Sequence, residues 1–397
     1  MTDPTRRRAT VLGLALATAL TISFCPAADA TVVSTHGDTV PEVTDLGPTS
    51  FSEPGPYAVG ESTLKLKTNK APVEVWFPAT PESVEGKPEA SYDMVSWMPE
   101  WVQKKLPAGF SLTYPSGGVR GVPVADGTFP LVVFSHGYAG FRDQSSFLTA
   151  WLASWGFVVA APDQHSRDIT TVLNLNTPPP GKKTTDVGDM RATITLMRTQ
   201  NVTNGTRFKG HVDMTKVAAV GHSAGAAAVE ALAAVDSRVD TFVSMAGASV
   251  GAFGEGKGGA FSKLPKVPGM IMAATDDGVV DSSSLVTAYG KLKKPKRFVA
   301  VGGGHHAFSD ICEIGAGQGG LVAVAELIGI PVSDKLKALA ADGCAPPALP
   351  PTEAWPAIRQ AVVAQLRHVF GFDTTTAGLD GLVEAFPGVV SDSESVG

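Results

Sequence analysis

The chain has 397 residues, of which 44% are hydrophobic and 18% are charged, and its formal net charge is −6. This composition is ordinary for a globular protein, and the length allows one large α/β domain with insertions or two domains. The acidic balance, without any compensating basic block, argues against nucleic acid as a partner.

The first thirty residues have the features of an export signal. Arg6, Arg7 and Arg8 are followed by an apolar run, 11–24, that is too short to span a bilayer. Small residues occupy the positions that a signal peptidase reads, up to Ala30. We therefore expect a signal peptide over residues 1–30, a secreted or cell-envelope protein, and no integral membrane segment after signal removal.

Residues 31–55 are polar and rich in proline and glycine, which predicts a flexible leader. From residue 56 to about 390, short apolar runs alternate with helical patterns. This rhythm predicts one α/β domain with a mostly parallel central sheet and helices on both faces. Strands are expected at 62–78 (two strands), 130–134, 157–161, 217–220, 241–245, 270–274 and 298–301, and helices at 97–106, 147–155, 189–200, 226–235, 321–328 and 355–370.

The most informative motif is Gly221-His222-Ser223-Ala224-Gly225, which lies between the strand at 217–220 and an alanine-rich helix. A strand, G-x-S-x-G and a helix in this order are typical of a nucleophile elbow. The two glycines fit because a Cβ at either position would collide with a neighbouring strand or helix. The motif predicts that Ser223 is a nucleophile that forms an acyl-serine ester.

The catalytic acid and base are expected in two later strand-end loops. The first loop contains Asp276 and Asp277, of which we favour Asp277, although either could cap the following helix. The second loop has three glycines followed by His305 and His306. We expect His305 to be the general base, with His306 as the alternative. Nucleophile, acid and histidine then follow in the α/β-hydrolase order.

An oxyanion hole requires two backbone N–H groups near the reacting carbonyl. One is expected from Ala224, and the other from Tyr138 in the loop after strand 130–134. His136 is expected to shape that loop. The adjacent His305 and His306 suggest a metal site as an alternative. Their spacing to Asp310 and Cys312 matches no zinc pattern, so we expect neither metal nor cofactor.

Removal of the signal would leave two cysteines, Cys312 and Cys344. In an exported protein we expect them to form a disulfide, which would be worth about 3 kcal/mol in the chain-entropy model. Two buried thiols are the alternative. The disulfide would tether an insertion at 312–350 that could form a lid over the site.

Several segments resemble the secreted and bacterial platelet-activating-factor acetylhydrolase family of α/β-hydrolases. They are LVVFSHGYAGFRDQSSFLTAWLASWGFVVAAPD (131–163), AVGHSAG around Ser223, GGGHHAFSD around His305, and GPYAVG with VEVWFPA near Trp76. The resemblance covers roughly residues 55–310. It implies Ser223, Asp277 and His305 as catalytic residues, Tyr138 as the second oxyanion donor, and cleavage of short acyl groups from lipids without calcium or any cofactor.

The chain departs from that family at two positions. Ala224 stands where the animal enzymes have a bulky aromatic residue, and a tyrosine in the oxyanion loop is similar to bacterial cutinases and polyester hydrolases. We therefore expect a secreted serine ester hydrolase of short-chain acyl esters, with acetylated phospholipids as candidates. The alternatives are a cutinase-like polyester or lipid hydrolase, and a non-catalytic envelope binding module on a hydrolase scaffold. The sequence leaves the oligomeric state open.

Overall fold

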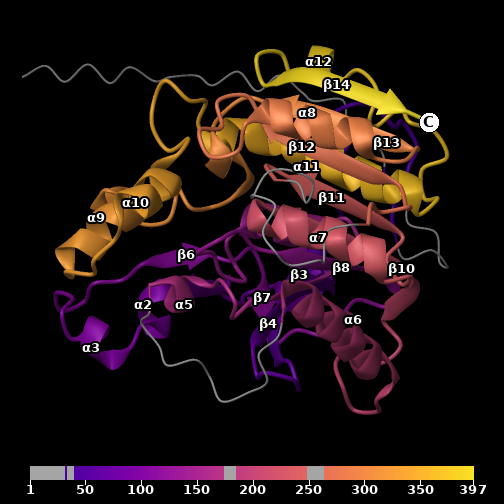
Figure 1. Cartoon of the computed structure of the whole chain (residues 1–397). Coiled ribbons are helices and arrows are strands. Elements are labelled where there is room, and N and C mark those ends of the chain that lie inside the picture. The colour runs from indigo at the N-terminus through magenta and orange to yellow at the C-terminus, as the bar shows by residue number, and fades with distance from the viewer. Residues whose placement is uncertain (1–31, 34–39, 174–184, 248–262) are drawn as a thin grey trace, which may run out of the picture.

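The computed structural model describes residues 32–33, 40–173, 185–247 and 263–397 (Figure 1). The expected signal peptide lies outside these residues. No helix within them is both long enough and apolar enough to cross a bilayer.

The centre of the described structure is a ten-stranded sheet (Figure 1). Its six central strands are parallel, and antiparallel strands flank them on both sides. Across the sheet the strands are Val390–Val396 (β14), Lys296–Val301 (β13), Gly269–Ala274 (β12), Thr241–Met245 (β11), Val212–His222 (β10), Phe129–Ser135 (β8), Val158–Pro162 (β9), Pro72–Ala79 (β4), Ala58–Lys65 (β3) and Val119–Arg120 (β7). Two small sheets pair Val32–Val33 (β1) with Glu42–Val43 (β2) and Ser91–Asp93 (β5) with Thr113–Pro115 (β6).

Helices cover both faces of the large sheet because its central strands are apolar on both sides. In β8, Val132 and Phe134 belong to one core cluster, whereas Leu131 and Val133 belong to the other. The first cluster includes Ser146–Ser154 (α4), Pro351–Val369 (α11) and Leu382–Ala385 (α12), and the second includes Asp186–Val202 (α6), Ala224–Val235 (α7) and Ser282–Lys291 (α8). This arrangement confirms the predicted α/β-hydrolase fold.

Shorter helices lie near the carboxyl ends of the parallel strands, where ligands bind in such folds. The expected helix at 97–106 is two short helices, because Pro99 cannot continue the first one. The insertion holds two helices rather than one. These elements are Met94–Trp97 (α2), Glu100–Gln103 (α3), Ile169–Val172 (α5), Gly320–Leu327 (α9) and Asp334–Ala341 (α10), with 3-10 turns at His305–Phe308 and Ala316–Gln318. The short helix Pro81–Val84 (α1) follows β4 at the opposite, amino ends of the parallel strands.

The described part of the expected leader lies against the hydrolase domain. Phe51 is fully buried, its ring meets Trp155 edge to face at 4.9 Å, and its backbone N–H donates to Gln360 of α11 at 2.5 Å. Leu46 packs against the same core cluster. Polar composition alone did not indicate this contact, in which Phe51 is the one fully buried aromatic side chain of the described part of the leader.

Replacing Phe51 with alanine should therefore destabilise the folded protein by about 3–5 kcal/mol, because a buried aromatic side chain leaves a cavity. Val286→Ala, at an exposed site on α8, is the control and should change stability by less than about 0.5 kcal/mol. Urea unfolding at pH 7 measures both. Equal stabilities for the two variants would show that the segment around Phe51 is not docked.

Candidate active site

Ser223 occupies the turn between β10 and α7. Its backbone has φ 57° and ψ −123°, a conformation that a non-glycine residue rarely adopts, and its N–H donates to Met245 O at 2.8 Å. A Cβ on Gly221 would lie 2.4 Å from Gly225 O, and one on Gly225 would lie 2.0 Å from Ser135 O. Both flanking glycines are therefore required by close backbone packing, as the sequence motif predicts.

His305 and Asp277 meet Ser223 from two other strand-end loops. The His305 Nε2 atom lies 2.8 Å from Ser223 Oγ, and its Nδ1 atom lies 2.9 Å from Asp277 Oδ2. The side chains of His305 and Asp277 are each 1% exposed. The structure thus brings together the three residues that the sequence singled out, from positions up to 82 residues apart.

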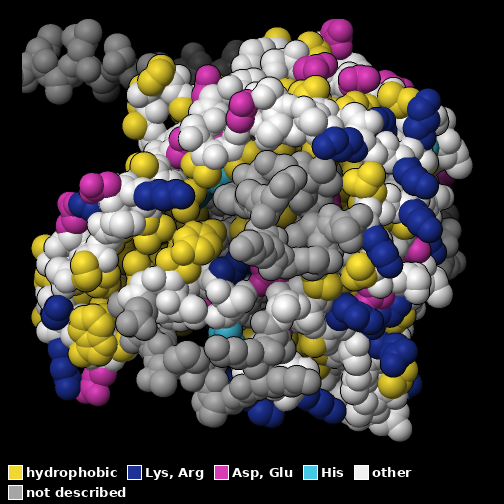
Figure 2. Space-filling view, viewed as in Figure 1, with side chains coloured by type: hydrophobic (Ala, Val, Ile, Leu, Met, Phe, Trp, Pro, Cys, Tyr) yellow, Lys and Arg dark blue, Asp and Glu magenta, His cyan; other side chains and the backbone are white. Residues whose placement is uncertain are grey.

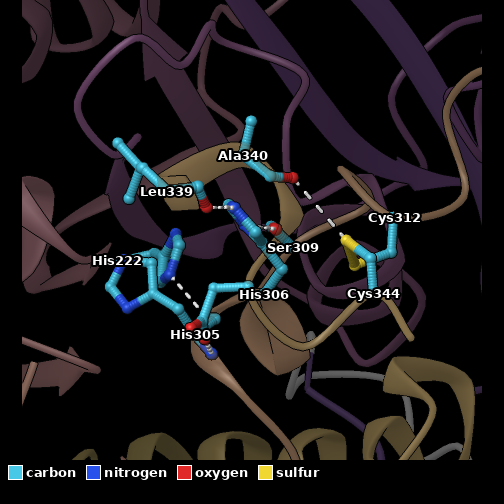
Figure 3. Close-up of a disulfide and its surroundings, with 9 residues drawn as sticks. His222, His305, His306, Ser309, Cys312, Leu339, Ala340 and Cys344 are labelled. Atoms are coloured by element: carbon cyan, nitrogen blue, oxygen red, sulfur yellow. Dashed lines mark hydrogen bonds between the residues drawn. A yellow bond between two sulfur atoms is a disulfide. The ribbon is translucent and has the colours of Figure 1, made fainter. Parts of the chain in front are cut away.

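The alternative acid and base residues lie elsewhere. Asp276 is exposed and accepts a hydrogen bond from its neighbour Thr275 at 3.1 Å. The His306 ring instead contacts Ser309 Oγ at 2.9 Å and the carbonyl oxygen of Leu339 at 2.9 Å (Figure 3). Burial lowers the pKa of His306 to about 3, so this imidazole is neutral.

The hydrogen-bond partners fix the direction of proton transfer at His305. Asp277 is an acceptor on the Nδ1 side, so Nδ1 carries the proton and Nε2 presents its lone pair to Ser223 Oγ. Asp277 is itself held, because its Oδ1 atom accepts the N–H groups of Val279 and Val280 at 2.8 Å each. This geometry can deprotonate the Ser223 hydroxyl and store the proton on an imidazolium beside a carboxylate.

His222 connects the elbow to the histidine loop. Its Nε2–H donates to the backbone carbonyl of His305 at 3.0 Å, and its Nδ1 accepts from Gln144 Nε2 at 2.9 Å. Burial is the main cause that lowers the pKa of His222 well below its ordinary value, which keeps this ring neutral. The Gln144 side-chain oxygen accepts the Gly137 N–H at 3.0 Å, so one glutamine joins the elbow to the expected oxyanion loop.

Arg167 sets the orientation of the loop that carries Tyr138. Its guanidinium is buried and donates to the carbonyl oxygens of His136 and Gly137, the latter at 2.6 Å. His136 Nδ1 donates to the same Gly137 carbonyl at 2.8 Å. Because a trans peptide directs its C=O and N–H groups in opposite directions, the Tyr138 N–H points away from Arg167. Neither the Tyr138 N–H nor the Ala224 N–H donates to an acceptor among the described residues.

His136 thus shapes the loop, as expected. Its Nε2 atom accepts the Gln164 N–H at 2.9 Å, so both ring nitrogens are engaged by backbone groups. Burial, followed by the charge of Arg167, lowers the pKa of His136 to about 4. A neutral His136 is what these two hydrogen bonds require.

An apolar pocket opens beside Ser223 and His305. Its lining is mostly apolar, and hydrophobic side chains gather on the side of the molecule where α3, α9 and α10 lie (Figure 2). The Tyr138 side chain lies at this pocket and is 50% exposed. Most of the apolar lining comes from three segments, 94–112, 169–173 and 311–340: Met94, Val95, Met98, Leu106, Leu112, Ile169, Leu173, Ile311, Leu321, Val322, Val324, Ala325, Ile328, Ile330, Val332, Leu336, Leu339 and Ala340.

The insertion forms one wall of this pocket and is tied to the histidine loop. Cys312 and Cys344 form a disulfide, with sulfur atoms 2.05 Å apart (Figure 3). Ile328 and Ile330 of the insertion pack with Val102 of α3 in a small separate core. The pocket therefore combines segments that lie far apart in the sequence, among them 94–112 and the insertion.

One group of three carboxylates among the described residues has the spacing of metal ligands: Glu61, Glu74 and Asp143. Arg120 contacts Glu61 at 2.5 Å and Glu74 at 3.1 Å, and Arg142 contacts Glu74 and Asp143 at 3.4 Å each. Burial raises the pKa of Glu61 to about 7. The two guanidinium groups compensate this acidic charge, so we interpret the group as an ion-pair network.

The fold and the serine-centred arrangement define a protein of the α/β-hydrolase class. Residues 93–250 match the family model described as Chlorophyllase. The match begins at the pocket wall, covers the loop that carries Tyr138 and the turn that carries Ser223, and ends before Asp277 and His305. It covers less than half of the chain, and together with the fold it supports an α/β-hydrolase that cleaves esters.

The positions of Gln144 and Arg167 were not predicted from the sequence. Gln144 lies within the segment 131–163 that carries the family resemblance but had no assigned role, and Arg167 lies outside the resembling segments; both act on backbone groups of the loop around Gly137. In the sequence they are marked only by lying shortly after strands β8 and β9. Many residues without such a role also lie shortly after a strand, so this position does not identify them.

The buried, neutral His306 predicts a specific pH dependence of stability. Its pKa is about 3 in the folded protein and about 6.5 when unfolded, so the unfolded chain binds the proton first as the pH falls. The wild type should therefore lose about 2 kcal/mol between pH 7 and pH 4.5 through this group. His306→Gln has no imidazole to protonate and should not lose this stability. The difference in free energy of unfolding between wild type and variant should therefore be smaller at pH 4.5 than at pH 7.

Urea unfolding of both proteins at the two pH values measures this difference, and groups common to both proteins cancel in it. A difference that stays constant between pH 7 and pH 4.5 would contradict a neutral His306 in the folded state.

Proposed function

We propose that this protein is a serine carboxylic-ester hydrolase that works through an acyl-serine intermediate. The observation that carries the proposal is the 2.8 Å contact between His305 Nε2 and Ser223 Oγ, with Asp277 on the opposite ring nitrogen. A binding module on the same scaffold would not require three buried groups in this order. Nor would it require a serine held in a backbone conformation as unfavourable as φ 57°.

In the proposed reaction, Ser223 Oγ attacks the ester carbonyl carbon while His305 Nε2 accepts the hydroxyl proton. The carbonyl π electrons move to oxygen, and the oxyanion is bound by the N–H groups of Ala224 and Tyr138. When the tetrahedral intermediate collapses, the bond to the leaving oxygen breaks and His305 gives its proton to the departing alcohol. A water molecule then repeats the sequence on the acyl-serine ester and releases the carboxylic acid.

The oxyanion hole is supported by how its loop is held. A Cβ on Gly137 would lie 3.2 Å from Ser223 Cβ, so the loop packs directly against the nucleophile. Arg167 binds the Gly137 carbonyl on one side, and the Tyr138 N–H on the opposite side donates to no acceptor in the part of the chain that the structure describes. One such donor is typically worth about 3 kcal/mol of transition-state stabilisation.

We infer that the substrate carries a large apolar group. The aliphatic side chains that line the pocket come from several segments of the chain and offer more apolar surface than an acetyl group can cover, and burying apolar surface there is favourable. Acetylated phospholipids satisfy this on the alcohol side of the ester, in keeping with the resemblance to platelet-activating-factor acetylhydrolases. A cutinase-like lipid or polyester hydrolase would place a long acyl chain there instead.

We also propose that the mature protein is extracytoplasmic. The basic and apolar pattern of residues 1–30 supports export, and a disulfide persists in oxidising compartments. No metal or other cofactor has a role in the proposed mechanism.

Ser223→Ala should lower kcat for p-nitrophenyl acetate by at least about 10³-fold and abolish labelling by a fluorophosphonate, because both need the Oγ atom. Ser391→Ala, at an exposed position on β14, is the matched control and should behave as wild type. Circular dichroism verifies that both variants are folded. Failure of the wild type to react with the fluorophosphonate would instead favour the binding module.

The pocket should also control the size preference. Rates measured with p-nitrophenyl esters of increasing acyl length and with acetate esters of increasing alcohol length should rise along at least one series. Val322→Trp places a large side chain in the pocket. It should lower the rates with the longest esters about 10-fold and leave the rates with small acetates unchanged. Leu327→Trp on the same helix is the control, because Leu327 is 61% exposed and lies outside the pocket.

A rise along the alcohol series supports acetylated lipids, and a rise along the acyl series supports the lipid or polyester hydrolase. Flat rates in both series, unaffected by Val322→Trp, would exclude a large apolar substrate group.

A further inference from the structure

The insertion that forms the pocket wall also contacts the backbone of the catalytic loops. His306, next to His305, contacts the Leu339 carbonyl at the end of α10, and the disulfide closes the chain behind it (Figure 3). The His306 N–H reaches the Asp342 carbonyl at 3.4 Å. Asp342 therefore lies between α10 and Cys344, directly against the histidine loop.

The side chain of Asp342 bridges the two loops that carry the acid and the base. Its Oδ1 atom accepts the His305 N–H at 2.6 Å, and its Oδ2 atom accepts the Gly278 N–H at 3.1 Å. Gly278 directly follows Asp277. One carboxylate thus holds the backbone at both members of the His305–Asp277 pair.

Close backbone packing leaves little freedom around this bridge. A Cβ on Gly304 would lie 2.5 Å from Gly343 Cα, and a Cβ on Gly278 would lie 2.4 Å from Asp342 Oδ2. Gly343 has φ +78°, which allows the chain to turn directly after Asp342. The glycines before His305 and after Asp342 are thus needed for the insertion and the histidine loop to meet.

We propose that Asp342 is a positioning residue that sets the spacing of the Asp277–His305 pair and couples the disulfide-tethered insertion to catalysis. This inference rests on the proposed ester-hydrolase function. Asp342 touches no atom of Ser223 and is not among the residues that line the pocket. Its effect on the reaction passes through the two N–H groups that it accepts.

The chemistry of the bridge requires a carboxylate. Hydrogen bonds to a charged acceptor are about twice as strong as those between neutral groups, and a carboxylate has two acceptor oxygens. Asparagine offers one oxygen and directs an NH2 group at the second N–H, so one of the two loops is released. Displacement of catalytic groups by about 1 Å can reduce a rate about 100-fold.

The test compares Asp342→Asn with Asp334→Asn. Both remove a carboxylate from the same insertion, but Asp334 is exposed in the first turn of α10 and contacts neither catalytic loop. We expect Asp342→Asn to lower kcat for p-nitrophenyl acetate about 10- to 100-fold with KM within about threefold of wild type. Asp334→Asn should retain wild-type kcat and KM.

Titration with a fluorophosphonate separates positioning from loss of folded protein. In Asp342→Asn, all sites should still be labelled, but at a rate reduced in proportion to kcat. A kcat within twofold of wild type, or a labelled fraction that falls while the remaining sites react at the normal rate, would overturn the proposal. Failure of the proposed function itself would be distinct, because the wild type would then not be labelled at all.

Reduction of the Cys312–Cys344 disulfide supplies a second measurement. Cys344 is exposed, so a soluble reductant has access to the bond. Release of the tether beside Asp342 should lower kcat in the wild type, whereas Asp342→Asn, already uncoupled, should lose at most about twofold more. Equal fold-losses in the two proteins would contradict coupling through Asp342.

Discussion

The hydrogen bond between Ser223 Oγ and His305 Nε2 is the contact on which the account of this protein depends. It joins the sharp turn after β10 to a loop that follows β13, and those strands are separated in the sheet by β11 and β12. Parallel strands place both loops at the same edge of the sheet. The sheet therefore supplies the proximity, and local hydrogen bonds supply the orientation.

Most of that orientation comes from groups that hold backbone atoms. Arg167 and His136 hold the carbonyl before Tyr138, His222 holds the carbonyl of His305, and Asp342 holds the N–H of His305. Burial keeps His136 and His222 neutral, which suits their use of one ring nitrogen as a donor and the other as an acceptor. Pre-arranged dipoles of this kind need no reorganisation during a reaction.

The sequence predicted those features that depend on local pattern. Apolar runs located the parallel strands, and G-x-S-x-G located the turn because the motif encodes close packing of Gly221 and Gly225. The sequence favoured Asp277 as the acid but did not exclude Asp276, because both residues lie in the loop after β12. The structure places Asp277 against His305. These predictions concern residues next to the carboxyl ends of strands. In this fold class functional side chains lie there, so the strand positions also located the candidate residues.

Features that depend on tertiary contact were not predictable. The strand β14 is polar and exposed along most of its length, so no apolar pattern marked it, and it pairs with β13 through its backbone. Helix α10 has only two apolar residues larger than alanine, Leu336 and Leu339, and it buries no residue fully. Gln144, Arg167 and Asp342 bind backbone groups that lie up to 64 residues away, which no motif records.

The most direct test of the central claim is to trap the acyl-enzyme. Rapid acid quenching after mixing with p-nitrophenyl acetate, followed by peptide mass mapping, should locate one acetyl group on the peptide that contains Ser223. The same adduct should form far more slowly in His305→Ala. Turnover without an acetyl group on Ser223, or an adduct that forms equally fast without the His305 imidazole, would contradict the account.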